Sequence, residues 1–195
     1  MHPELELPVA SPTRLWREPA FPFVRFLEAH HEVLRAEADA LEPEDFVDWP
    51  QRSGYLGVWR VFCFLSRDPA WMLARTCARN ARRVPETVRL LRRIPGLARA
   101  GLSLLMPGSH IGAHRDGRDG DQDLLRCHLG LRSNPRAVLR VDGVTVPCVP
   151  GRCVVFDGQA LHEAANLGEA PRLACLLDVD RAALEHEVPG WREAV

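Results

Sequence analysis

The stretch LSLLMPGSHIGAHRDG (residues 102–117) contains the features that decide the fold of this chain. Two short apolar segments flank a Met-Pro-Gly turn, and the second of them runs into His114-Arg115-Asp116. Apolar runs of this length between Pro and Gly are typical of β-strands. Residues two apart on extended backbone point to the same side, so His114 and Asp116 can approach a common ligand. The stretch therefore predicts two strands, with a histidine and a carboxylate together where the second strand ends.

Similar short runs, separated by Gly, Pro, Asn and Asp, continue to residue 179. After LSLLM (102–106) and HIGAH (110–114) they are LLRCHLGL (124–131), AVLRV (137–141), VTVPC (144–148), RCVVF (152–156), LHEAA (161–165) and RLACLLDV (172–179). Asp142-Gly143 between two of these runs is a strong signal for a tight hairpin. Eight short strands at this spacing predict an eight-stranded jelly roll, with helices packed against one sheet.

The N-terminal half has a different pattern. Five prolines predict an extended arm over residues 1–22. We expect a helix from Phe26 to Leu41, a strand within Leu56–Leu65, a helix from Asp68-Pro69 to Ala81, and another from Pro85 to Pro95-Gly96. The expected organisation is one domain. It consists of the arm, a helical support region (23–100), a jelly-roll core (101–180) and a C-terminal helix or tail (181–195).

Composition narrows the class of protein. The 195 residues carry a net charge of −1, which argues against a general nucleic-acid binder. No apolar run approaches the roughly 20 residues that a membrane span needs. The six cysteines follow no signal-peptide pattern and include no C-x-x-C, so we expect reduced thiols and a cytoplasmic protein.

His114, Asp116 and a distant His162 match the sequence form of a 2-His-1-carboxylate triad, which binds Fe(II) and leaves positions open for substrates. His110 lies four residues before His114, a ligand spacing that suits a helix rather than this expected strand. The acidic stretch DGRDGDQD (116–123) lacks the order of an EF-hand calcium loop, and a solvated loop is the expectation for it.

Two of the expected strands place cationic residues opposite an apolar face. Arg126 and His128 share one face of LLRCHLGL, and Arg172 shares a face with Ala174 and Leu176. Alternation of this kind also suits a strand whose polar face meets water. If Arg172 is buried, its guanidinium can bind a carboxylate in a bidentate manner, through two parallel hydrogen bonds. A dicarboxylic acid beside iron suggests 2-oxoglutarate as a co-substrate.

Several of these segments together resemble the aspartyl/asparaginyl β-hydroxylases. The similar segments are LSLLMPGSHIGAHRDG, LLRCHLGL, GRCVVFDGQALHEAAN (151–166), PRLACLLDVD (171–180), WRVFCF (59–64) and VPETVRLLRRIPG (84–96), in the same order and with similar gaps. The resemblance covers about residues 50–180 and excludes the N-terminal arm. It implies a double-stranded β-helix (a cupin-like jelly roll) and a stand-alone, bacterial-type catalytic domain.

The resemblance further implies an oxygenase that uses Fe(II), 2-oxoglutarate and O2. It implies that His114 and His162 bind the metal, and that Ser103, Arg126, His128 and Arg172 bind 2-oxoglutarate, with Arg172 and Ser103 on the distal carboxylate. Animal members have Gly where this chain has Asp116, so Asp116 either completes the triad or lies beyond the metal's ligands; we expect direct ligation.

The substrate is not readable from the sequence. The β-carbon of an Asp- or Asn-type residue, in a peptide or a related small amino acid, is the first expectation, and a lipid acyl chain or another small molecule is the alternative. A cupin-like metal-binding module without oxygenase activity is a further alternative, because His162-Glu-Ala-Ala-Asn166 matches the end of a cupin motif. The paired histidines of the first cupin motif are absent from the sequence.

Overall fold

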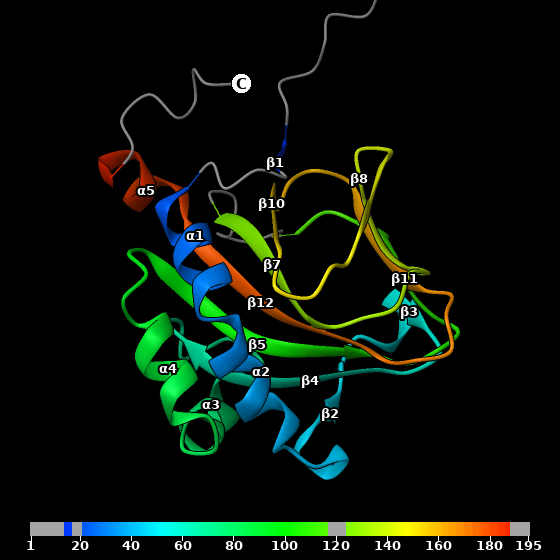
Figure 1. Ribbon diagram of the computed structural model, residues 1–195, viewed down its shortest axis with the longest axis horizontal. Coiled ribbons are helices and arrows are strands. Elements are labelled where there is room, and N and C mark those ends of the chain that lie inside the picture. The colour runs from blue at the N-terminus through cyan, green and yellow to red at the C-terminus, as the bar shows by residue number, and fades with distance from the viewer. Residues whose placement is uncertain (1–13, 17–20, 117–123, 188–195) are drawn as a thin grey trace, which may run out of the picture.

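The structure is a computed structural model that describes residues 14–16, 21–116 and 124–187. It consists of two antiparallel sheets (Figure 1). The large sheet has the order β1 (Leu15–Trp16), β10 (Cys153–Asp157), β7 (Leu124–Arg132), β12 (Arg172–Asp180), β5 (Leu97–Leu105), β4 (Trp59–Ser66) and β2 (Val47–Asp48). The small sheet has the order β3 (Tyr55–Leu56), β6 (Ser109–His114), β11 (His162–Asn166), β8 (Ala137–Val141) and β9 (Val144–Pro147).

The eight strands expected after residue 101 correspond one by one to β5–β12, so the mainly β, jelly-roll fold is confirmed. The tight hairpin between β8 and β9 is also present. Val141 pairs with Val144, and both turn residues have positive φ, 43° at Asp142 and 84° at Gly143. Asn, Asp and Gly tolerate that conformation best, which is why this dipeptide identifies the turn.

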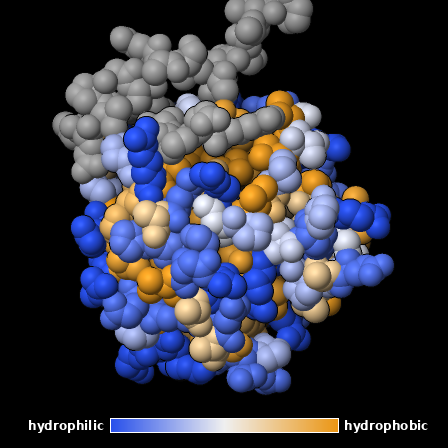
Figure 2. Space-filling view, viewed as in Figure 1, coloured by the Kyte–Doolittle hydropathy of each residue, from blue (hydrophilic) through white to orange (hydrophobic). Residues whose placement is uncertain are grey.

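Helices cover the outer face of the large sheet, as expected (Figure 1). The outer core packs this face against α1 (Pro22–Ala29), α2 (His31–Asp39), α4 (Pro85–Leu91) and α5 (Arg181–Glu187). A second core lies between the two sheets and includes Trp59, Val61, Ile111, Leu139 and Phe156. We call the side of the large sheet that meets this second core its inner face. The helical surface itself is largely hydrophilic, with scattered hydrophobic patches (Figure 2).

Three helix predictions were wrong in their limits, and one of them is the helix expected from Pro85 to Pro95-Gly96, which ends at Leu91 as α4. The helix expected over 26–41 is divided at His30, whose backbone leaves the helical range at φ −111°, ψ 9°. The His30 ring contacts the carbonyl of Phe26 through Nδ1 at 2.8 Å, so the side chain occupies an acceptor that an uninterrupted helix gives to its backbone.

The helix expected from Asp68 instead begins at Ala74, as α3 (Ala74–Ala81), which packs on β4. Asp68 does accept a backbone hydrogen bond, from Ala70 at 2.8 Å. That bond closes a local turn rather than a helix, because aspartate side chains favour turns as readily as helix caps.

Some expectations fall outside the described residues: most of the N-terminal arm, the acidic stretch 117–123 and the tail after residue 187. All six cysteines are described, and all are free thiols. Among the described helices, none has both the length and the apolar character of a membrane span. The division into support region and core stays a prediction, and β2, β3 and β4 show that residues before 101 also contribute to both sheets.

Candidate active site

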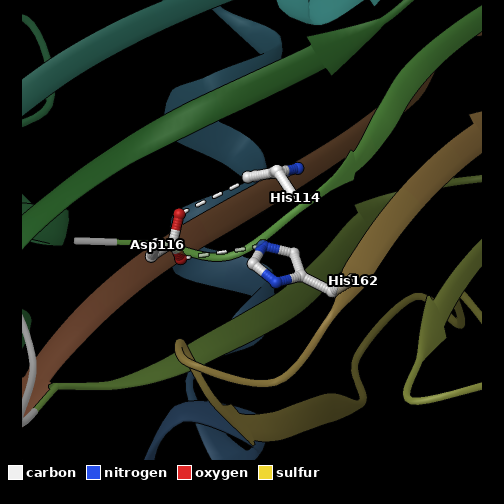
Figure 3. A group of neighbouring side chains, drawn as sticks. All are labelled: His114, Asp116 and His162. Atoms are coloured by element: carbon white, nitrogen blue, oxygen red, sulfur yellow. Dashed lines mark ion pairs between the residues drawn. The ribbon is translucent and has the colours of Figure 1, made fainter. Parts of the chain in front are cut away.

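His114 is the last residue of β6 and His162 is the first residue of β11, and the two lie side by side on the small sheet. The two residues are direct partners in the ladder, and their ring centroids are 4.2 Å apart. Asp116 follows two residues after β6, and its carboxylate faces both rings, with one oxygen directed toward each (Figure 3). The fold thus brings His162 together with His114 and Asp116, which are distant from it in sequence, at one end of the small sheet.

The donor atoms of these residues converge. Asp116 Oδ1 is 3.7 Å from Nε2 of His114, and Asp116 Oδ2 is 3.6 Å from Nε2 of His162 (Figure 3). One ligand atom from each of the three residues lies within 4.8 Å of the others, and the described part of the chain contains no second group of three or more His, Cys, Asp or Glu so arranged. Two imidazoles and a carboxylate suit Fe(II) among other divalent transition metals.

Hydrogen bonding at the far side of each ring favours metal binding through Nε2. Nδ1 of His114 lies 2.8 Å from the Gly112 carbonyl, and Nδ1 of His162 lies 2.9 Å from the Ala160 carbonyl. A carbonyl only accepts, so each Nδ1 carries a proton, and in a neutral ring of this tautomer the lone pair is on Nε2. Burial lowers the pKa of His162 to about 4 despite the nearby Asp116, so this ring is neutral at physiological pH.

The backbone of Asp116 is held by the turn that leads from β10 to β11. Its N–H donates to the Gly158 carbonyl at 2.8 Å, and the Gln159 side chain donates to its carbonyl. Its Oδ2 is buried and accepts no well-aligned hydrogen bond among the described residues, and it forms an ion pair with Nη1 of Arg126 at 3.1 Å. A buried carboxylate beside two imidazole Nε2 atoms is a donor set that suits a divalent cation.

Arg172 is not a surface residue. Its side chain is among the largest that are fully buried, with 1% relative exposure. Nη2 donates to His128 Nδ1 at 3.2 Å, while Nε of Arg172 and Nε2 of His128 are buried and lack hydrogen-bond partners in the described structure. Burial and the Arg172 charge hold the pKa of His128 well below its ordinary value. His128 is therefore neutral, and its unpartnered Nε2 carries the proton.

Ser103 lies on β5 and is also buried, accepting a hydrogen bond from the Trp59 indole at 3.0 Å. It is opposite Ala174, two residues from Arg172 on β12. Rings connect this region to the metal ligands: His128 contacts Phe156 at 5.2 Å between centroids, and Phe156 contacts His162 at 4.8 Å. Ser103, His128 and Arg172 therefore occupy the same side of the large sheet as the triad.

Arg126 also lies on the inner face, as the alternation in β7 predicted, while Leu125, Cys127 and Leu129 pack in the outer core. Its guanidinium contacts protein carboxylates. Nε and Nη2 donate to Asp178 at 2.8 and 3.2 Å, and Nη1 is 3.1 Å from Asp116 Oδ2. Asp178 was missed in the sequence, although its position six residues after Arg172 places it on the same face of the strand.

His110 belongs to a different cluster. Its Nε2 is 2.8 Å from Glu163, which also pairs with Arg140 at 3.0 Å. His110 is not part of the triad, in agreement with the sequence argument. The roles of the individual site residues stay predictions. The geometry shows three residues that could hold a metal ion on the same side of the large sheet as a buried cationic group, an arrangement suited to a metal ion together with an anionic organic molecule.

Comparison with known proteins agrees with this site. The family model for aspartyl/asparaginyl beta-hydroxylase matches residues 28–182. The chain is 34% identical over 169 residues to the ornithine lipid ester-linked acyl 2-hydroxylase of Rhizobium tropici, covering 81% of this chain and 57% of that protein. It is 34% identical over 142 residues to aspartate beta-hydroxylase domain-containing protein 2 of Mus musculus, covering 67% and 38%. The chain thus spans about half the length of these relatives or less.

Among solved structures, the non-heme alpha ketoglutarate dependent epimerase SnoN from nogalamycin biosynthesis has a similar fold. The TM-score is 0.52 at 16% identity, and the match covers 86% of this chain and 77% of that one. At this identity the likeness concerns the fold alone. The family match covers most of the chain and includes every residue of the site, so the chain belongs to the aspartyl/asparaginyl beta-hydroxylase family.

Proposed function

We propose that this protein is an Fe(II)- and 2-oxoglutarate-dependent dioxygenase that hydroxylates an unactivated C–H bond. The observation that carries the proposal is the placement of two features on one side of the large sheet. One is the His114–Asp116–His162 group, and the other is the buried Arg172, whose Nε has no partner among the described residues. A buried guanidinium with an open donor is strongly stabilised by an anionic ligand.

His114, Asp116 and His162 would hold the metal. Bound Fe(II) supplies activation of dioxygen, with 2-oxoglutarate as the reductant that is converted to succinate and CO2. Arg172 would bind the distal carboxylate of 2-oxoglutarate, with Ser103 beside it. Neutral His128 orients the guanidinium through Nδ1 and offers an N–H donor at Nε2. These side chains are buried between the sheets, where charge-assisted contacts are stronger than in water.

The first substrate class is an Asp- or Asn-type residue hydroxylated at its β-carbon, following the family to which the chain belongs. The six free thiols support a reducing compartment such as the cytoplasm. The test is a substrate panel with Fe(II) and 2-oxoglutarate, comprising Asp- and Asn-containing peptides and free amino acids. Succinate release and a product heavier by one oxygen atom are the two measurements, and His162→Ala is the matched inactive control.

A second substrate class is a lipid acyl chain. It is favoured by the relative from Rhizobium tropici, named for an acyl 2-hydroxylase activity, which matches 81% of this chain. Vesicles containing ornithine lipid belong in the same panel, with mass spectrometry of the released fatty acids. Succinate formation without a hydroxylated product from either substrate class would support the co-substrate chemistry and would direct the search to other substrates. No succinate under any condition would favour the cupin-like binding module.

A further inference from the structure

A row of alternating charges crosses the large sheet and ends at the candidate metal site. Asp178 on β12 lies directly opposite Arg126 on β7 and directly opposite Arg99 on β5. It accepts from Nε and Nη2 of Arg126 and from Nε of Arg99 at 2.7 Å. Arg126 then extends to Asp116, 3.1 Å away. The order is Arg99, Asp178, Arg126, Asp116.

Most of this row is sheltered from water. The side chain of Asp178 is 9% exposed, those of Arg99 and Arg126 are 14% and 21%, and that of Asp116 is 19%. Burial alone would raise the pKa of Asp178, but the two flanking guanidinium groups outweigh it and lower this pKa overall. Asp178 therefore stays ionised, and its two hydrogen bonds from Arg126 hold the guanidinium in one orientation.

Asp116 needs such support because it lies beyond the end of β6. The turn at Gly158 fixes its backbone, but sheet pairing does not fix its side chain. Nη1 of Arg126 forms an ion pair with Asp116 Oδ2, the oxygen that faces His162, and this contact restrains the orientation of the carboxylate toward the histidines. Groups that orient metal ligands in this way commonly change metal affinity by about 10- to 100-fold when they are removed.

We propose that Arg126 is a positioning residue that holds Asp116 as a metal ligand, and that Asp178 and Arg99 anchor Arg126 for this task. The inference rests on the proposed metal site and deepens it. It concerns metal binding alone and is separate from the expected contact between Arg126 and 2-oxoglutarate.

Whether substitution of Arg126 weakens or strengthens metal binding distinguishes a positioning role from a simple charge effect. A cation near a metal site repels the metal, so removal of a merely adjacent charge would tighten metal binding. The same tightening would follow if Arg126 competed with the metal for Asp116. Positioning predicts the opposite: Arg126→Gln weakens binding because the carboxylate loses its orientation. Arg126→Lys keeps the charge without the two-point contact to Asp178, so it should also weaken binding.

The experiment is a titration of the protein with Mn(II) alone, in which free Mn(II) is measured by electron paramagnetic resonance. No 2-oxoglutarate is present, so contacts to the co-substrate cannot contribute. We expect about 10-fold weaker binding in Arg126→Gln and a weakening in Asp178→Asn. Arg132→Gln is the matched control, because Arg132 is on the same strand but pairs with Asp39 at the surface; its affinity should equal that of the wild type.

The Asp116→Asn background provides the decisive comparison. If Arg126 acts through Asp116, adding Arg126→Gln to Asp116→Asn should not weaken Mn(II) binding further, and loss of the repulsive charge should leave it equal or tighter. Circular dichroism melts verify folding, and Arg126→Lys takes the place of Arg126→Gln if the latter does not fold. Unchanged or tighter binding in the single variants, or additive weakening in the double variant, would overturn the inference. If His114→Ala and His162→Ala also bind Mn(II) normally, the metal site itself is refuted instead.

Discussion

Arg172 and His128 form one buried unit: Nη2 of the guanidinium donates to Nδ1 of the imidazole at 3.2 Å, across the neighbouring strands β12 and β7. The contact decides two things at once. It places the proton of neutral His128 on Nε2, and it leaves Nε of Arg172 without a partner among the described residues. Two donors are therefore available on the inner face of the large sheet, where 2-oxoglutarate is proposed to bind.

Substitution of Arg172 by Ala should raise the 2-oxoglutarate requirement strongly, with a smaller effect on metal binding. A charge-assisted contact of this kind contributes about 1.5–3 kcal/mol, or roughly 10- to 150-fold in affinity. Titration of 2-oxoglutarate against the metal-loaded protein measures the change. An unaltered dissociation constant would remove Arg172 from the co-substrate site.

His114→Ala and His162→Ala should each abolish metal-dependent decarboxylation of 2-oxoglutarate while the fold is retained. Each variant loses one of three ligands, and the paired Nε2 donors are the core of the site. Metal content of the purified variants and their circular dichroism spectra are the measurements. His110→Ala is the control, since His110 pairs with Glu163 outside the triad. Full iron loading of either triad variant would contradict the assignment.

Asp116→Gly should remove most of the activity and weaken Fe(II) binding by about 10-fold or more. The carboxylate lies within 3.7 Å of both imidazole Nε2 atoms, which is the basis for expecting direct ligation. Family members with Gly at this position function without the carboxylate, so near-normal activity of the variant would show that water can replace Asp116 here as well. Steady-state succinate formation measures the activity.

The free energy of unfolding should depend on pH in part through His128. Burial and Arg172 keep its pKa well below the ordinary value in the folded protein, so near pH 6 the unfolded chain binds a proton that the folded chain does not. The free energy of unfolding therefore falls as the pH drops below about 6.5, by up to about 1.4 kcal/mol per pH unit from this one group. Urea unfolding between pH 7 and pH 5, with chelator present, should show a shallower slope in His128→Asn than in the wild type. Equal slopes would mean that His128 is protonated in the folded state.

Local sequence patterns determined much of this protein. The eight strands from β5 to β12, the Asp142-Gly143 hairpin and the shared face of Arg126 and His128 follow from the two-residue period and from turn residues, which act over a few positions. The H-x-D spacing before a distant histidine was enough to select His114, Asp116 and His162, and the structure brings these three together. The limits of the helices near His30 and Asp68 were less predictable, because side-chain hydrogen bonds there compete with helical ones.

Only the tertiary structure decided which partners the charged residues take. Alternation left Arg172 free to face water or protein, and the strand order buries it beside His128. The same order puts Asp178 between Arg126 and Arg99, so that Arg126 meets two carboxylates. The period of a strand fixes the face on which a side chain lies, but its neighbours across the sheet depend on pairing between distant segments, and local sequence does not encode that pairing.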